Sequence, residues 1–315
     1  MESGFKRTNA RHHDGGFARI DLVVLLALAF LGSGLLLPAL RRQKDYSATM
    51  VGGSNLKRLT AAWHLYANDN GEKLVPSGDG GDSGKVSTKP AWAGGWLNFD
   101  NQNSDNTNTS YLTNPFGQRG GFLPGSTNRS AGREPSHYGG LLGSYESDPL
   151  VFRNPNDPSQ ISAINGRSLP RVRSVSMNLM LGSAPQTNGW ASWNTALGYR
   201  VFPSLPSFGS VSPSSKFVFI EEHPDSIDDG MFIVDMTTDE TGVPTRFVDV
   251  PANYASGAFW ISFADGRVDL WKFKGPLFQK AYAGPVPIQP GSIWPEFTRP
   301  EALQLKRLFE ATTSR

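Results

Sequence analysis

The feature that most constrains this chain is an apolar segment near its N-terminus. The nineteen residues from Leu22 to Leu40 carry no charge. A membrane-spanning helix needs about 20 predominantly apolar residues, so this segment can cross a bilayer once. It ends at two arginines, without the small residues of a signal-peptide cleavage site. We therefore expect a retained membrane anchor over residues 22–40.

The composition of the whole chain hides this segment. Lys plus Arg number 30 and Asp plus Glu 28, which gives a formal net charge of +2, and the mean hydropathy is −0.35. A near-neutral chain gives no reason to expect a nucleic-acid partner. The chain has no cysteine, which excludes disulfides, Cys-ligated zinc, iron–sulfur clusters and thiol nucleophiles.

Two features stand directly before the apolar segment: a Gly-Gly pair ahead of Phe17, and the acidic residue Asp21. An unpaired carboxylate beside hydrocarbon costs a few kcal/mol, so it is usually kept for a partner. A cut between Gly16 and Phe17 would create an ammonium group about one helical turn from Asp21 in the same or a neighbouring chain. Charge neutralisation would then favour side-by-side packing of such helices.

The residues from Gly15 to Val24, followed by Pro38 near the end of the apolar run, resemble the cleavage and methylation segment of type IV prepilins and type II secretion pseudopilins. The resemblance implies that a prepilin peptidase cuts after Gly16 and methylates the amine of Phe17. It also implies that Asp21 neutralises that amine during assembly, although the family usually has Glu there.

Motifs further along the chain resemble, in the same order, those of a large pseudopilin-like family abundant in Planctomycetes and Verrucomicrobia. They are the stretches 55–59, 66–70, 151–157, 173–178, 222–230 and 263–267. These motifs cover most of the chain between about residues 16 and 275 and are far more specific together than singly.

Several positions depart from the family pattern. Arg19 stands where an apolar residue is usual, and Arg267 replaces a histidine. The family commonly carries one cysteine near the position of Gly53 or its neighbour and another at the position of Asn154. If relatives form a disulfide between these two places, this chain has lost it.

The predicted fold class is α+β: a long N-terminal helix with a transmembrane part, then a mainly antiparallel β-sheet head with long loops, as in pilins. The predicted parts are a leader over 1–16, a helical spine over 17–70, a loop-rich insertion over 71–170, a sheet core over 171–275, and a C-terminal extension with a helix over 276–315.

Local patterns support this division. Apolar residues at helical spacing predict an amphipathic helix from Asn55 to Asn68, after a looser stretch over 50–55, and Asn70-Gly71 is typical of a helix end. A Thr-x-x-Glu pattern at Thr298 predicts a helix to about Glu310. The predicted strands are Val172–Met177, Phe217–Glu221, Met231–Val234, Ala258–Phe263 and Val268–Phe273, the last two joined at Asp265-Gly266.

One acidic stretch is a candidate for a metal or reactive site. It comprises Glu221, Glu222, His223, Asp225, Asp228 and Asp229. Carboxylates in an irregular loop suit Ca²⁺, for which Glu222, Asp225, Asp228 and Asp229 are candidate ligands. Ile227 breaks the EF-hand spacing, and a zinc hydrolase would need further histidines. The alternative is a turn whose Asp and Ser side chains cap backbone groups. Asp79, Asp82, Asp100 and Asp105 are weaker calcium candidates.

The sequence therefore predicts a pseudopilin-like, membrane-inserted precursor without enzymatic activity, a subunit of a type IV pilus-like or type II secretion-like filament. Its expected partners are a prepilin peptidase, other pilin or pseudopilin subunits through the N-terminal helix, and the inner membrane, with a single pass and an extracytoplasmic head. The flanking charges do not fix this orientation; the resemblance implies it. The alternative is an uncleaved, membrane-anchored extracytoplasmic domain that binds calcium or a glycan, or hydrolyses a substrate.

Overall fold

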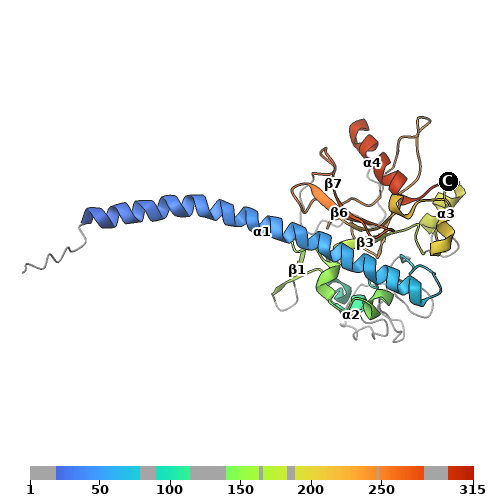
Figure 1. Cartoon of the computed structure of the whole chain (residues 1–315), viewed down its shortest axis with the longest axis horizontal. Coiled ribbons are helices and arrows are strands. Elements are labelled where there is room, and N and C mark those ends of the chain that lie inside the picture. Colours follow the sequence, from blue (N-terminus) through green and yellow to red (C-terminus); the bar gives the residue numbers. More distant parts are fainter. Residues whose placement is uncertain are drawn as a thin grey trace, which may run out of the picture. The chain divides into compact units, whose positions relative to one another are not determined.

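A computed structural model describes residues 19–78, 90–113, 140–162, 166–182, 189–246, 248–279 and 297–315 (Figure 1). In the first helix the side chains of residues 19–21, 29, 31–42, 44 and 45 are not among those described. The chain divides into two compact units, Met1–Asp45 and Tyr46–Arg315. The second unit is called the head below.

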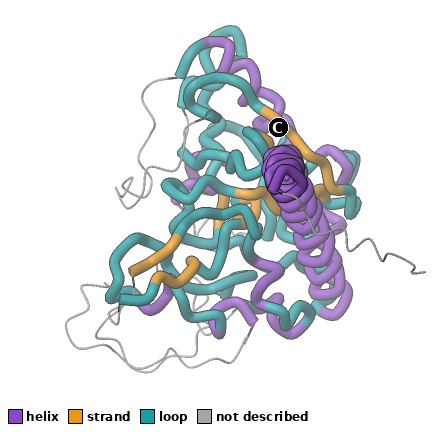
Figure 2. Tube along the Cα trace, turned by 90° about the vertical axis from the view of Figure 1, so that its left-hand side faces the viewer, coloured by secondary structure: helices purple, strands orange, loops and turns teal. Residues whose placement is uncertain are grey.

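The structure contains both α-helices and β-strands, and most of its strand pairs are antiparallel. The α+β class is therefore confirmed. The helices are α1 (Arg19–Asp69), α2 (Ser110–Thr113), α3 (Gly189–Ala196) and α4 (Arg299–Thr312). The strands are β1 (Gln160–Ser162), β2 (Ser168–Pro170), β3 (Val175–Asn178), β4 (Phe217–Glu221), β5 (Met231–Phe232), β6 (Ala258–Phe263) and β7 (Val268–Lys272). Single turns of 3₁₀-helix and long stretches of loop connect them (Figure 2).

Helix α1 runs without a break through residues 50–55, where the sequence predicted a looser stretch. It ends as predicted: Gly71 has a φ of 62°, and the backbone N–H of Glu72 donates to the carbonyl of Ala67 at 2.7 Å. Among the residues that the structure describes, no helix combines the length and the hydropathy that a membrane crossing requires.

Five strands form the main sheet in the order β5-β3-β4-β6-β7, and β1 and β2 form a separate antiparallel pair. Every pair in the main sheet is antiparallel except β3 with β5. The predicted β6–β7 hairpin is confirmed, with Gly266 at a φ of 87°. Strand β3 begins later than predicted, at Val175, because the backbone N–H groups of Val172 and Ser174 donate to the carbonyls of Asn106 and Phe152 rather than to a neighbouring strand.

An irregularity in β4 decides which way its side chains point. The β4–β6 register shifts between Phe217 and Ile220. Val218 and Phe219 consequently both pack in the cluster on the α1 side of the sheet, whereas Phe217 and Ile220 pack in the cluster on the other side. An inserted residue in a strand reverses the alternation that follows it. The bulge therefore turns Glu221 toward α1.

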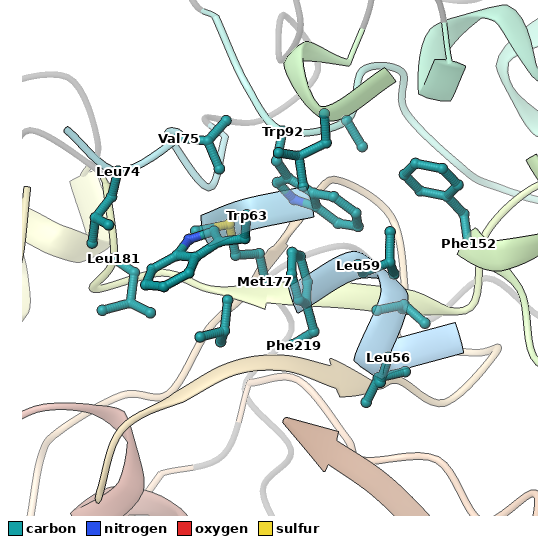
Figure 3. Close-up of a cluster of buried hydrophobic side chains, with 14 of the residues drawn as sticks. Leu56, Leu59, Trp63, Leu74, Val75, Trp92, Phe152, Met177, Leu181 and Phe219 are labelled. Carbon is teal, nitrogen blue, oxygen red and sulfur yellow. The ribbon is translucent and has the colours of Figure 1, made fainter. Parts of the chain in front are cut away.

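The sheet is covered on both faces. On one face, Leu56, Leu59 and Trp63 of α1 pack against β3 and β4 with Met177 and Phe219 (Figure 3). On the other face, Leu305, Leu308 and Phe309 of α4 pack against β4, β5 and β6. Burying one such side chain contributes roughly 1.5–3 kcal/mol. Helix α4 has the predicted capping box, in which the side chain of Glu301 accepts the N–H of Thr298 at 2.8 Å.

Two glycines let α1 approach the sheet closely. A Cβ atom placed on Gly52 would lie 2.5 Å from Nδ2 of Asn154 and 2.6 Å from Oε1 of Glu221. One placed on Gly53 would lie 2.9 Å from the ring of Trp260, whose Nε1–H donates to the carbonyl of Thr49 at 2.7 Å. The helix continues through this Gly-Gly pair because packing against the head offsets the poor helix propensity of glycine.

We therefore expect Gly52→Ala to destabilise the head by about 1–3 kcal/mol, because the added methyl group overlaps Asn154 and Glu221. In an open helix the same change would stabilise by about 0.5–1 kcal/mol. Urea unfolding followed by circular dichroism measures the effect, and Ser54→Ala, at an exposed position of the same turn, is the matched control. A stabilised Gly52→Ala variant would contradict the close approach.

Candidate functional site

The residues predicted for processing and assembly fall at the edge of what the structure describes. Gly16 and Phe17 lie outside the described residues. Asp21 and Pro38 belong to the helical range of α1, but their side chains are not among those described. Their roles stay predictions.

The described part of the segment 22–40 is apolar on every side. Its exposed side chains are Leu22, Val23, Val24, Leu25, Leu26, Leu28 and Phe30, with exposed fractions of 51–81%. Five of them are consecutive, and successive residues of an α-helix point about 100° apart. An apolar surface around the full circumference of a helix is typical of membrane spans and of helices buried among other helices.

The acidic stretch begins at the last residue of β4, and its neighbouring side chains lie in different surroundings. Glu221 is buried on the α1 side, where Oε2 accepts the N–H of Trp260 at 2.9 Å and Oε1 accepts from the amide of Asn154. Burial raises its pKa to about 7, although both hydrogen bonds oppose the shift. Glu222 is buried near Arg173 and accepts a hydrogen bond from the hydroxyl of Ser226 at 2.5 Å. The sequence stretch is therefore not one site.

Two fully buried arginines hold the loop that joins β4 to β5. Arg171 donates to the carbonyls of Pro224 and Ile227, both at 2.6 Å. Arg173 donates to the carbonyls of Val175, at 2.8 Å, and Asp229. Because both guanidinium groups bind main-chain oxygens, they fix the path of the loop while leaving positive charge to balance the nearby carboxylates.

Four carboxyl groups share this interior with the two arginines: Glu222, Asp228, Asp229 and Asp249. Burial raises the pKa of Glu222 to about 8 and that of Asp228 to about 6. Burial together with the neighbouring carboxylates also raises the pKa values of Asp229 and Asp249 well above their usual range. Four carboxylates against two cations would leave two uncompensated charges, which the raised pKa values relieve by holding protons.

The calcium candidates are partly dispersed. Asp225 faces the imidazole of His223, with 3.8 Å between Oδ2 and Nδ1. Asp229 accepts the N–H of Met231 at 2.9 Å, and Asp228 accepts that of Asp229 at 2.7 Å, as the capping alternative predicts. Within the described ranges, no group of three or more His, Asp or Glu residues is arranged to hold a metal ion. The calcium assignment stays a prediction.

The weaker calcium candidates divide in the same way. Asp79 and Asp82 lie outside the described residues. Asp105 is buried and accepts the N–H of Trp96 at 2.9 Å, and Asp100 accepts that of Gln102 at 2.9 Å. These side chains stabilise an Asn-rich loop in which side chains replace the backbone ladder of a regular element.

Reasoning from the sequence missed Arg171, Arg173 and Asp249 as members of the buried charged cluster. The two arginines alternate within Arg-Val-Arg at the start of a predicted strand, which was a usable signal. Asp249 reaches the cluster from a distant loop, where it accepts the N–H of Ile233, and no local pattern marks it.

Comparison of the chain with family models, curated proteins and solved structures found no match.

The buried glutamates predict how stability depends on pH. A carboxyl group whose folded-state pKa is raised contributes stability that is complete below its unfolded pKa and lost as pH rises through its folded pKa. For Glu221 and Glu222 the window runs from 4.5 to about 7 and about 8, respectively. We expect the free energy of unfolding to fall across this window by on the order of a few kcal/mol, measured by urea unfolding.

Glu221→Gln should flatten part of this slope, because it removes one titrating group and keeps the side-chain shape. Glu240→Gln, at an exposed position, should leave the slope unchanged. A free energy of unfolding that rises between pH 5 and pH 8 would contradict the assignment of buried, protonated glutamates.

Proposed function

We propose that this chain is a pseudopilin-like subunit precursor. A prepilin peptidase removes residues 1–16, the N-terminal part of α1 anchors the protein in the inner membrane as a single pass, and the head stands outside the cytoplasm. The same helix packs against its counterparts in a type IV pilus-like or type II secretion-like filament. The proposal assigns no catalytic residue to this chain, because the chemistry of maturation belongs to the peptidase.

The observation that carries the proposal is the contrast between the two parts of α1. From Leu22 to Phe30 large apolar side chains are exposed all round the helix, whereas from Leu56 to Trp63 the apolar side chains form one buried stripe. Apolar surface of the first kind needs lipid or other subunits to cover it. The second kind needs only the head of the same chain.

A second observation supports the resemblance to pseudopilins. Relatives are expected to carry cysteines near Gly53 or its neighbour and at Asn154. Here Gly52 and Asn154 are in contact, since a Cβ on Gly52 would lie 2.5 Å from Nδ2 of Asn154. The two places are thus close enough for side chains to meet, as a bridge in relatives would require.

Processing can be tested by mass spectrometry of the N-terminal peptide after expression with a prepilin peptidase. We expect the wild-type protein to begin at a methylated Phe17 and Gly16→Ala to keep residues 1–16. Gly15→Ala is the matched control and should be processed. A wild-type envelope protein that still carries the leader would contradict the proposal.

The role of Asp21 can be separated from processing. We expect Asp21→Ala to be cut normally but to lose cross-linked multimers, because the Phe17 ammonium loses its partner in a low-dielectric environment. Asp21→Glu keeps the charge and should keep the multimers. Unchanged cross-linking of Asp21→Ala would show that this carboxylate does not drive assembly.

A further inference from the structure

Among the described strands, β7 stands at one end of the main sheet and is paired along one edge, with β6 (Figure 1). The hairpin closes where the N–H of Phe263 donates to the carbonyl of Arg267 at 2.8 Å. In an antiparallel pair, hydrogen-bonded and non-hydrogen-bonded residue pairs alternate from such a point. Val268, Leu270 and Lys272 therefore direct their backbone N–H and C=O groups away from β6.

The partner residue on β6 confirms this alternation. Trp260 stands opposite Leu270, and its N–H donates to Glu221 of β4, on the far side from β7. Residues of a non-hydrogen-bonded pair point their backbone groups in opposite directions. Leu270 must therefore point its own groups outward.

Among the described residues, Gln304 closes this outer edge at one end, and the rest of the edge has no paired strand. At Lys274, the N–H donates to Oε1 of Gln304 and the carbonyl accepts from Nε2 of Gln304, both at 2.6 Å. The side-chain amide thus takes the place of a paired strand. At Val268, Leu270 and Lys272, the outward backbone groups bind no residue that the structure describes.

The side chains around the open edge are apolar and cationic. Leu270 is 46% exposed, and Lys272 beside it on the same face is exposed. On the opposite face the guanidinium of Arg307 lies 3.7 Å from the centre of the Trp271 ring. The acidic residue of the strand, Asp269, is paired with Arg267. Charged edge strands resist indiscriminate pairing, so the excess of cations selects for an acidic strand.

We propose that the open edge of β7 binds an extended acidic peptide segment of a partner protein as an added strand. Main-chain hydrogen bonds to Val268, Leu270 and Lys272 hold the peptide, which is the recognised mode of β-strand addition. An apolar side chain packs on Leu270. Acidic side chains lie beside Lys272 on one face and beside Arg307 on the other. This inference is independent of the proposed processing and assembly.

The probe is a fluorescent nine-residue peptide, Val-Val-Glu-Glu-Val-Val-Glu-Glu-Val, titrated into the full chain in detergent and followed by anisotropy. As a strand it carries both valine and glutamate on each face. We expect saturable binding that is lost when every peptide nitrogen is methylated, because methylation removes the donors. Equal binding of the methylated peptide, or no binding of the first, would overturn the proposal.

Variants of β7 test the same edge. Leu270→Pro removes an outward N–H without breaking a bond to β6, so it should abolish binding while the head stays folded. Lys272→Glu should weaken binding about tenfold, equivalent to about 1.4 kcal/mol, by opposing the peptide charge. Leu270→Ala should weaken binding, and Leu303→Ala, an exposed leucine on α4, should not.

Two outcomes reject the acidic-peptide assignment. Binding that survives both Leu270→Pro and Lys272→Glu would place the peptide elsewhere. The Asp21→Ala chain, with and without Leu270→Pro, can be compared by sedimentation velocity. Self-association of Asp21→Ala that disappears when Leu270→Pro is added would assign the edge to a second copy of this chain.

Discussion

The head depends on the packing of the C-terminal part of α1 against the main sheet. Gly52 and Gly53 allow the helix to approach Trp260, and about two turns later the hydroxyl of Thr60 donates to that of Ser262 at 2.7 Å. The loop segments that carry Trp92 and Phe152 pack into the same cluster, where the two rings stack with their centres 5.8 Å apart. A sheet without this helix would leave one apolar face in water and the loops without an anchor.

Much of this arrangement was predictable because its signals are local. The stripe from Leu56 to Trp63, the Asp265-Gly266 turn and the capping box at Thr298 each depend on a few adjacent residues. The uninterrupted course of α1 through Gly52-Gly53 was not predictable, since propensity argues for a break there and only contacts with Asn154 and Trp260, distant in sequence, favour the helix. The bulge in β4 is hidden for the same reason, because every residue of that strand is buried and no alternation remains to be read.

The acidic stretch shows a second feature that local sequence does not predict, namely which side chains meet in the folded chain. Six titratable residues adjacent in sequence predicted one site, but the strand bulge sends Glu221 toward α1 and leaves Glu222 with partners from other segments. The interior that Glu222 shares with Arg173 and Asp249 is assembled by tertiary contacts. The local sequence therefore identified the carboxylates but not that they lie in separate surroundings. It also did not identify the two arginines whose positive charge balances the buried carboxylates.

The head and the N-terminal part of α1 differ in how their apolar side chains are covered. This difference suggests a physical reason for the proposed cleavage. The head buries its own apolar side chains, whereas the side chains from Leu22 to Phe30 remain exposed and need lipid or other helices. Before cleavage, Asp21 would sit beside that apolar surface with its charge unneutralised by a chain end. After cleavage, the ammonium of Phe17 would supply the missing charge within reach of a neighbouring subunit. Removing residues 1–16 would thus convert a helix that merely anchors into one that can associate.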